Sequence, residues 1–407
     1  MKSRWLETPA HVTEREGDLP AGFRMAGAAC GLKPSGSLDV GLCVAGPDTV
    51  SAARFTRSGV LAAPVVLCQT RTRLDAIRVV VVNSGNANAA TGRRGLEEAA
   101  RMQGAAAMAG GVPEDQVAVA STGVIGVLLD AGVAIKGIAR ARGELRPHGM
   151  GDFSEAIQTT DKFAKEVEVD VALGSGTVRL TAQAKGAGMI SPRFATMLCF
   201  VQTDAAMSAE TADLLLGLCV SRSFDRVSVD GQLSTNDTVI LQASGESGVQ
   251  VLPQSEDEVR FGEALDWALR RLALAIVRDG EGARRVGRVV VSGGTDDVAA
   301  AVARAVANSP LVKAALHGGD PNWGRIAQAV GGVLVDTAPL AMDIFIEDVQ
   351  VCAGGTAVPY DAPALAEAVS GDEVEYTVRL PGEEAEAEVF FSDLSHDYVT
   401  INAEYTT

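Results

Sequence analysis

A glycine-rich loop that runs into a short, continuous apolar segment most constrains the fold of this chain. The loop spans residues 185–196, and residues 197–201 then read Met-Leu-Cys-Phe-Val. Its glycines permit backbone conformations that a Cβ would forbid, and its proline restricts the preceding residue to extended geometry. The apolar run is typical of a strand buried on both faces, although a buried helix start gives the same pattern. Thr196 is therefore expected where a shaped loop meets a rigid element. An ordinary loop-to-strand junction explains the stretch equally well by itself.

Composition favours closely packed layers of helices and sheets. Of the 407 residues, 47% are hydrophobic but only 4% are aromatic, so Ala, Val, Leu and Gly must build the core. A chain of this length is expected to form two or three domains.

The charge balance argues against a nucleic-acid or membrane-surface role. The chain has 35 Lys and Arg against 52 Asp and Glu, a net charge of −17. Such a surface repels phosphate backbones and anionic lipid headgroups. No apolar run approaches the roughly 18 residues of a membrane span, and the N-terminus lacks a signal-peptide pattern. We expect a cytoplasmic protein.

The cysteines and histidines do not form a metal-binding pattern. The six cysteines include no pair at CxxC spacing and no Cys/His cluster at metal-ligand spacing. We expect them to be reduced core residues, with no metal and no cofactor.

Alternating strands and helices are predicted along the chain, starting with the β-branched run Val79–Val82. Residues 55–60 together with 61–68 are expected to form a loop and a strand, and residues 166–173 and 177–184 a hairpin. Further strands are predicted at 117–120, 226–229, 238–243, 289–292, 342–346, 373–380 and 388–391. Helices are predicted at 93–109, 152–161, 209–220, 261–276, 297–307 and 311–316.

Two strands end in polar segments that could contribute to a site. The first predicted strand ends at Asn83, and the polar stretch 83–92 could cap the next helix or present hydrogen bonds to a ligand. The second ends in Ser121-Thr-Gly, where the Thr122 hydroxyl and the Gly123 N–H suit an oxyanion hole. Read alone, this signal is weak because many strands end in Thr-Gly.

Two common enzyme classes do not fit the motifs. The chain has no GxxxxGK[ST] sequence, and its Gly186-Ala-Gly188 lacks the third glycine of a dinucleotide fingerprint. It has four histidines and no GxSxG around a serine, which disfavours a Ser-His-Asp hydrolase.

A threonine nucleophile can instead use its own backbone nitrogen as the base. Cleavage of the Ala195–Thr196 bond would give Thr196 an α-amino group, and such amines titrate near ~7.7 to 8.0. A useful fraction is then neutral at physiological pH and can accept the hydroxyl proton. The same hydroxyl could perform the cleavage by attacking the Ala195 carbonyl, giving an ester that water opens.

Six motifs together resemble the ornithine acetyltransferase (glutamate N-acetyltransferase) family. They keep the family order and span the chain from about residue 20 to its end. These motifs are residues 185–192 with 195–198, 83–88, 121–126, 279–282, 320–325 and 402–407.

The resemblance implies a self-cleaving, N-terminal-nucleophile acetyltransferase that needs no cofactor. Thr196 would take the acetyl group from N-acetylornithine and pass it to glutamate. Fragments 1–195 and 196–407 would stay associated, as a heterotetramer of two copies of each. Thr122 and Gly123 match the family's oxyanion pair. The substrate-contacting positions matched are Thr159, Lys185, Thr196, Glu281, Asn402 and Thr407.

The fold implied by the resemblance is α/β, a layered sandwich of sheets flanked by helices with a smaller α+β C-terminal domain. Residues 1–284 would form the catalytic domain, and residues 285–407 a domain whose tail returns to the active site.

Departures from the family pattern bear on the substrate. The segment 157–165 lacks the usual Met, Thr and Pro around its Thr-Thr-Asp, and Gln232-Leu233 replaces the usual Asp-Thr. A paralogue acting on another acylated amino acid therefore stays open. So do an amidase or aminopeptidase with the same nucleophile and a non-catalytic binding protein. The resemblance also leaves open acetyl-CoA as a second donor, which bifunctional members of the family use.

Overall fold

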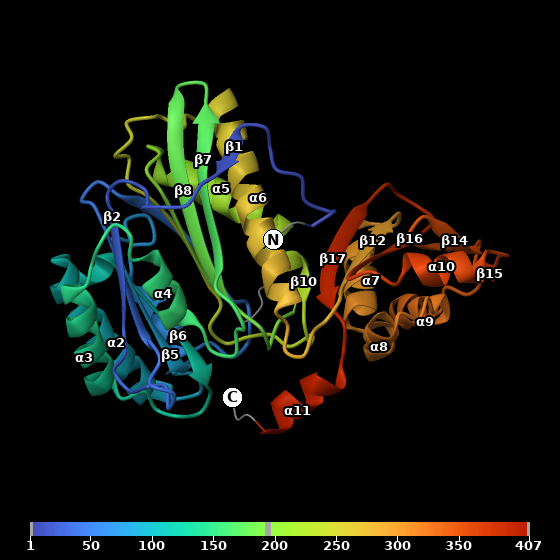
Figure 1. Cartoon of the computed structure of the whole chain (residues 1–407), viewed down its shortest axis with the longest axis horizontal. Helices are drawn as coiled ribbons and strands as arrows, with labels where there is room; N and C mark the ends of the chain where they lie inside the picture. Colours follow the sequence, from blue (N-terminus) through green and yellow to red (C-terminus); the bar gives the residue numbers. More distant parts are fainter. Residues whose placement is uncertain (1–2, 192–196, 405–407) are drawn as a thin grey trace.

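The computed structural model describes residues 3–191 and 197–404, whose strands form three sheets (Figure 1). Residues 192–196, which include Ala195 and Thr196, and residues 405–407, which include Thr407, lie outside the described part. Two of the sheets pack against each other, and the third contains most of the C-terminal strands.

The four-stranded sheet is built from β-branched and small residues and is covered by helices on one face. Its strand order is β2 (Phe23–Ala28), β3 (Val40–Ala45), β5 (Val79–Asn86) and β6 (Val117–Val124). Val81, Val119 and other side chains of one face pack on three helices. These helices are α1 (Ala63–Arg71), α2 (Gly92–Gly110) and α3 (Ala131–Gly143).

The opposite face of this sheet packs toward a six-stranded sheet, with α4 (Met150–Ile157) inserted beside it. The order of the second sheet is β1 (Val12–Glu14), β7 (Lys165–Leu173), β8 (Gly176–Lys185), β9 (Leu198–Thr203), β11 (Thr238–Ala243) and β4 (Val50–Phe55). Phe153 of α4 and Phe200 of β9 meet edge to face with ring centroids 5.5 Å apart. The layers are thus held by few aromatic contacts among many small residues.

Two helices cover the outer face of the six-stranded sheet. They are α5 (Ala209–Arg222) and the long α6 (Glu256–Arg278), whose apolar stripe includes Leu265, Leu272 and Ile276. Ser255 caps α6 by accepting a hydrogen bond from the Glu258 N–H, and three acidic residues in its first turn complement the helix dipole. α6 ends at Arg278, and Asp279, the next residue, contacts Lys165 at the start of β7.

The third sheet has seven strands and its own apolar core. Its order is β10 (Val227–Ser228), β17 (Glu386–Ser392), β12 (Val286–Ser292), β16 (Glu373–Arg379), β13 (Asp343–Ile346), β14 (Val349–Ala353) and β15 (Thr356–Ala357). The helices packed here are α7 (Asp296–Asn308), α8 (Pro310–Gly318), α9 (Trp323–Val333) and α10 (Ala362–Ala368). Two short 3₁₀ helices, Glu114–Gln116 and Phe224–Arg226, complete the elements before the tail.

The last helix, α11 (His396–Glu404), leaves the third sheet and lies below the lower ends of β7 and β8 (Figure 1). Layered sheets flanked by helices, with an α+β C-terminal part, confirm the predicted fold class. The division between residues 284 and 285 stays a prediction.

Three local predictions were wrong. Residues 63–71 form helix α1 rather than a strand. Pro64 suits the first turn of a helix, and the buried side chains of α1 face α2 and β6. The helix predicted to reach Asp161 ends at Ile157, which leaves 158–164 as a loop. The strand predicted to end at Val82 continues to Asn86, because β6 pairs with it.

The contact between the two inner sheets should contribute strongly to stability. We expect Phe200→Ala to lower the free energy of unfolding by about 3–5 kcal/mol, because it removes a fully buried ring from the interface. Urea denaturation is the measurement. Leu214→Ala, at a side chain 53% exposed on α5, is the control and should change stability by less than about 0.5 kcal/mol. Equal effects of the two variants would contradict this view of the core.

Candidate active site

A pocket of about 140 Å³ is lined by the ends of β6 and β8 and by residues of α11. Six of the predicted site residues line it. They are Thr122, Gly123, Thr159, Lys185, Glu281 and Asn402. The other three predicted residues, Ala195, Thr196 and Thr407, lie outside the described residues.

Thr122 and Gly123 occupy the end of β6, beside β5. Gly123 has φ +129°, and a Cβ there would lie 2.4 Å from the Gly85 carbonyl carbon and 2.6 Å from the Asn86 nitrogen. Only glycine permits this approach between strands. The main chain of Gly123 and the buried Thr122 hydroxyl are therefore held at the pocket wall by sheet pairing.

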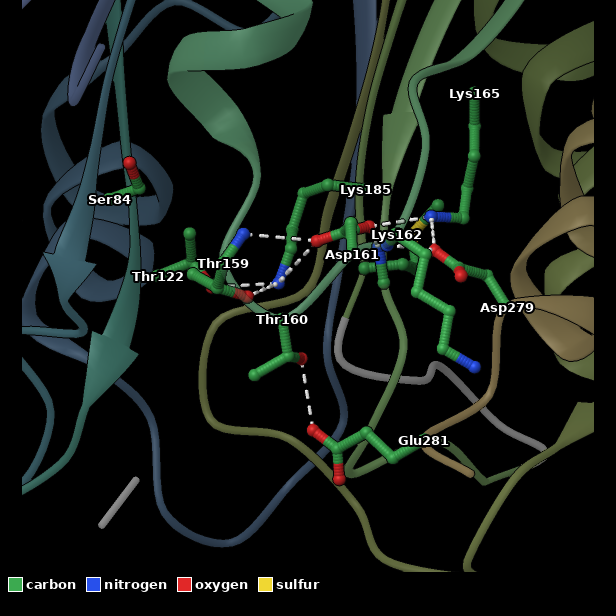
Figure 2. A network of polar contacts seen from close by, with 12 residues as sticks. Ser84, Thr122, Thr159, Thr160, Asp161, Lys162, Lys165, Lys185, Asp279 and Glu281 are labelled. Atoms are coloured by element: carbon green, nitrogen blue, oxygen red, sulfur yellow. Dashed lines mark hydrogen bonds and ion pairs between the residues drawn. The ribbon is translucent and has the colours of Figure 1, made fainter. Parts of the chain in front are cut away.

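Lys185, the last residue of β8, directs its ammonium toward two threonine hydroxyls (Figure 2). Its Nζ donates hydrogen bonds to Thr159 Oγ1 at 2.8 Å and to Thr122 Oγ1 at 3.2 Å. Burial lowers its pKa, which the Asp161 carboxylate partly offsets. A cation thus stands beside the Thr122–Gly123 segment.

Glu281 supplies an anion across the pocket from Lys185. Its carboxylate accepts hydrogen bonds from Thr160 Oγ1 at 2.9 Å and from Asn402 Nδ2 at 2.8 Å. Its N–H donates to the Ala187 carbonyl at 2.9 Å. A Cβ at Gly188 would lie 2.6 Å from the Glu281 carboxyl carbon, so glycine at 188 makes room for this side chain.

Asp161 ties together the segments that carry the pocket. It accepts hydrogen bonds from the N–H groups of Thr159 at 3.0 Å and Gly186 at 2.7 Å. Burial by itself would raise its pKa, but the Lys185 and Lys165 cations and the Thr159 N–H hold the pKa at about 2. The carboxylate is therefore charged throughout the ordinary pH range.

Met197, the residue bonded to Thr196, is anchored by a buried carboxyl group. Its N–H donates to Asp237 Oδ1 at 3.0 Å, and its carbonyl accepts from the Thr238 N–H at 3.2 Å. Burial raises the pKa of Asp237 well above its usual range. The start of β9 is consequently fixed against β11, its parallel neighbour.

Several pocket residues were not predicted from the sequence. Thr160, Asp230 and Tyr398 line the same cavity. Thr160 is adjacent to Thr159, which was predicted. Asp230 and Tyr398 reach the cavity only through contacts between segments far apart in the sequence. Asn83, in contrast, uses its amide for the Asn86 carbonyl and the Ser121 hydroxyl, so its polar side chain serves strand pairing.

The described residues hold no group of three or more His, Cys, Asp or Glu side chains arranged for a metal ion. Nor does any helix within residues 3–191 and 197–404 have the length and apolar character needed to cross a membrane. All six cysteines are free thiols.

Comparison with known proteins assigns the family. The model of the ArgJ family matches residues 24–407. The arginine biosynthesis bifunctional protein ArgJ of Symbiobacterium thermophilum is 43% identical over 392 residues, which cover 95% of this chain and 98% of that protein. This chain belongs to the ArgJ family. The resemblance predicted from the six motifs is thereby confirmed.

Two further relatives of the ArgJ-family chain extend the comparison. The protein of the same name from Geobacter sulfurreducens is 43% identical over 390 residues, covering 95% of this chain and 99% of the relative. The crystal structure of the ornithine acetyltransferase of Mycobacterium tuberculosis, complexed with ornithine, is 35% identical. It covers 44% of this chain and 98% of the solved chain, with a TM-score of 0.41.

Protonation of Asp161 should destabilise this ArgJ-family protein in acid. Its folded-state pKa lies below the ordinary value of 3.8, so the carboxylate contributes stability above about pH 4 and loses it as the pH falls toward 2. The contribution corresponds to about 2 kcal/mol. Between pH 4 and pH 2, wild type should lose that much more unfolding free energy than Asp161→Asn.

Chemical denaturation at each pH provides the measurement. Asp48→Asn, at an exposed position, is the control and should follow the wild-type pH dependence. Parallel curves for wild type and Asp161→Asn would show that the charge of Asp161 does not stabilise the fold.

Proposed function

We propose that this ArgJ-family chain is a self-processing ornithine acetyltransferase, which moves an acetyl group from N2-acetylornithine to glutamate through an acetyl-Thr196 intermediate. This is a step of the cyclic route of arginine biosynthesis. The observation that carries the proposal is the pocket itself. It combines a buried cation, Lys185, and an anion, Glu281, with the Thr122–Gly123 segment.

Self-processing begins with attack of the Thr196 hydroxyl on the Ala195 carbonyl carbon. The peptide C–N bond breaks as the nitrogen takes up a proton, which leaves an ester between Ala195 and the Thr196 oxygen. Water hydrolyses that ester to the Ala195 carboxylate and the free hydroxyl. Thr196 then carries an α-amine, the base that an N-terminal nucleophile requires.

Acetyl transfer follows in two half-reactions. The α-amine takes the Thr196 hydroxyl proton while the oxygen attacks the acetyl carbonyl carbon of N-acetylornithine. The proton passes to the leaving nitrogen, so ornithine departs and an acetyl ester remains. The α-amine of glutamate then attacks the ester, and its proton returns to the Thr196 oxygen. In both steps the Thr122 hydroxyl and the Gly123 N–H stabilise the tetrahedral oxyanion.

Lys185 and Glu281 suit substrates that carry both signs of charge. N-acetylornithine has a carboxylate and a side-chain ammonium, and each needs a charged partner once it leaves water. We assign the carboxylate to Lys185, with the hydroxyl of Thr159 beside it, and the ammonium to Glu281. Asn402, which donates to the Glu281 carboxylate at 2.8 Å, fixes the orientation of that anion.

The tail from α11 onward belongs to the same site in this proposal. Asn402 lines the pocket, and Thr407 lies five residues further along the chain. We therefore propose that domain 285–407 completes the active site of domain 1–284. We further propose that fragments 1–195 and 196–407 assemble as a cytoplasmic heterotetramer, two copies of each.

A second donor is supported by the relatives, which are named bifunctional proteins. Acetyl-CoA would acetylate Thr196 in place of N-acetylornithine, with coenzyme A leaving as the thiol that takes the hydroxyl proton, and glutamate would accept the acetyl group in the same way. Formation of N-acetylglutamate from acetyl-CoA in the absence of N-acetylornithine tests this activity.

Thr196→Ala should abolish both processing and transfer, because alanine lacks the attacking oxygen. On a denaturing gel, wild type should give two fragments and the variant one full-length band. Intact mass spectrometry after incubation with N-acetylornithine should show the 196–407 fragment heavier by one acetyl group, and no acetyl adduct on the variant. An active wild type that runs as a single uncut band would contradict the mechanism.

An N-terminal-nucleophile amidase is the alternative, and acceptor dependence distinguishes it. With N-acetylornithine alone, a transferase should release ornithine only until Thr196 is acetylated. Glutamate should then restore turnover and yield N-acetylglutamate. Quantifying ornithine, acetate and N-acetylglutamate by chromatography is the measurement. Continuous release of acetate that ignores glutamate would favour the amidase.

A further inference from the structure

Beneath the pocket lies a buried ion cluster that the proposed mechanism does not use. Lys165, at the start of β7, donates from Nζ to Asp161 Oδ1 and to Asp279 Oδ2, each at 2.6 Å (Figure 2). The three side chains are all but inaccessible to solvent, with 0% exposure. Lys165 Nζ donates a third hydrogen bond to the Phe163 carbonyl at 3.4 Å. All three ammonium hydrogens of Lys165 therefore have acceptors.

Asp161 stands between two lysines but pairs closely with only one. Lys165 Nζ lies 2.6 Å from its Oδ1, whereas Lys185 Nζ lies 4.0 Å from its Oδ2. Lys185 instead donates to the threonine hydroxyls at the pocket wall. Attraction between buried charges is strong, so a carboxylate without Lys165 would draw the Lys185 ammonium toward itself.

We propose that Lys165 is a positioning residue for the acetyl transfer: by pairing with Asp161 it leaves the Lys185 ammonium directed into the pocket. This inference rests on the proposed function. It adds a role for a residue that touches neither substrate nor the reacting atoms.

The same lysine connects the two charged sides of the pocket. Asp279 directly follows α6, two residues before Glu281, and its Oδ2 also accepts the Lys162 N–H at 3.0 Å. Asp161 accepts the N–H groups of Thr159 and Gly186, which flank Lys185 in space and in sequence. Lys165 thus fixes the Lys185 side relative to the Glu281 side. A cation just beyond the last turn of α6 is also favoured by the helix dipole.

Removing Lys165 should change the pH dependence of kcat/KM as well as the binding of N-acetylornithine. The titratable groups that act on Lys185 come from several elements: Asp161, Lys165, Glu281, Asp237 and Lys33. Lys165 is a cation among them that lowers the pKa of Lys185. Its loss, together with closer approach to Asp161, raises that pKa. Lys185 then stays charged to higher pH, so the alkaline limb of kcat/KM moves upward.

The test compares Lys165→Met with Lys162→Met in glutamate-dependent transfer from N-acetylornithine. Lys165→Met should raise the KM for N-acetylornithine about tenfold, because the charge-assisted contact of Lys185 with the substrate carboxylate is misplaced. The value of kcat should change less than about threefold. The alkaline limb should move up by about half a pH unit or more. Lys162 is exposed and contacts the cluster through its backbone N–H, so its variant makes the same charge change and should behave as wild type.

Two further variants separate positioning from folding. Lys165→Met leaves two buried carboxylates with one fewer cation, so Lys165→Met/Asp279→Asn, which removes one charge of each sign, is measured beside it. The double variant should show the same KM rise and the same alkaline shift. Lys165→Arg keeps the cation and should keep the alkaline limb within about 0.2 pH units of wild type.

The proposal is overturned if Lys165→Met and the double variant fold and undergo self-cleavage but keep the wild-type KM and the wild-type alkaline limb of kcat/KM. It is also overturned if both fail to fold or process, because a purely structural role then suffices. Failure of wild type itself to transfer acetyl to glutamate would refute the proposed function instead.

Discussion

The pocket depends on a single buried carboxylate, Asp161. It sits in a loop between α4 and β7, and it holds the N–H groups of Thr159 and Gly186 while it pairs with Lys165. Together with the hydrogen bond from Lys185 Nζ to Thr159 Oγ1, this carboxylate joins the 158–164 loop to the end of β8. Burying an ion is costly unless its hydrogen-bonding capacity is filled, and here two N–H groups and the Lys165 ammonium donate to the carboxylate, with the Lys185 cation 4.0 Å away. These contacts hold the pocket walls in place before substrate binds.

Small residues allow the charged groups to come this close. Gly123 packs against the backbone of β5, and Gly188 lies against the Glu281 carboxylate. In both places a single methyl group would collide with its neighbour. The layer between the two inner sheets and α4 combines small residues such as Ala118 and Ala120 with the rings of Phe153 and Phe200.

The mechanism we propose needs both signs of charge in one cavity, and distant parts of the chain supply them. Lys185 stands at the end of a hairpin, Glu281 follows the longest helix, and Asn402 comes from the final helix. Each is placed by the end of a rigid element, which limits its freedom before substrate binds. Such preorganisation reduces the entropy that binding must otherwise overcome.

The sequence by itself determined the main strands, the layered α/β class and the family, because β-branched runs and motif order are local properties. It also indicated six residues that line one pocket. It failed where local pattern and tertiary packing disagree. Residues 63–71 carry β-branched side chains yet form α1, since their buried face is set by α2 and β6. The link from Lys165 to Asp279 spans 114 positions, and neither its pairing nor the burial of its charges leaves a periodic signal in the chain. Only the tertiary structure decided which of two lysines pairs with Asp161 and which one faces the pocket, because that choice rests on distances between elements far apart in sequence.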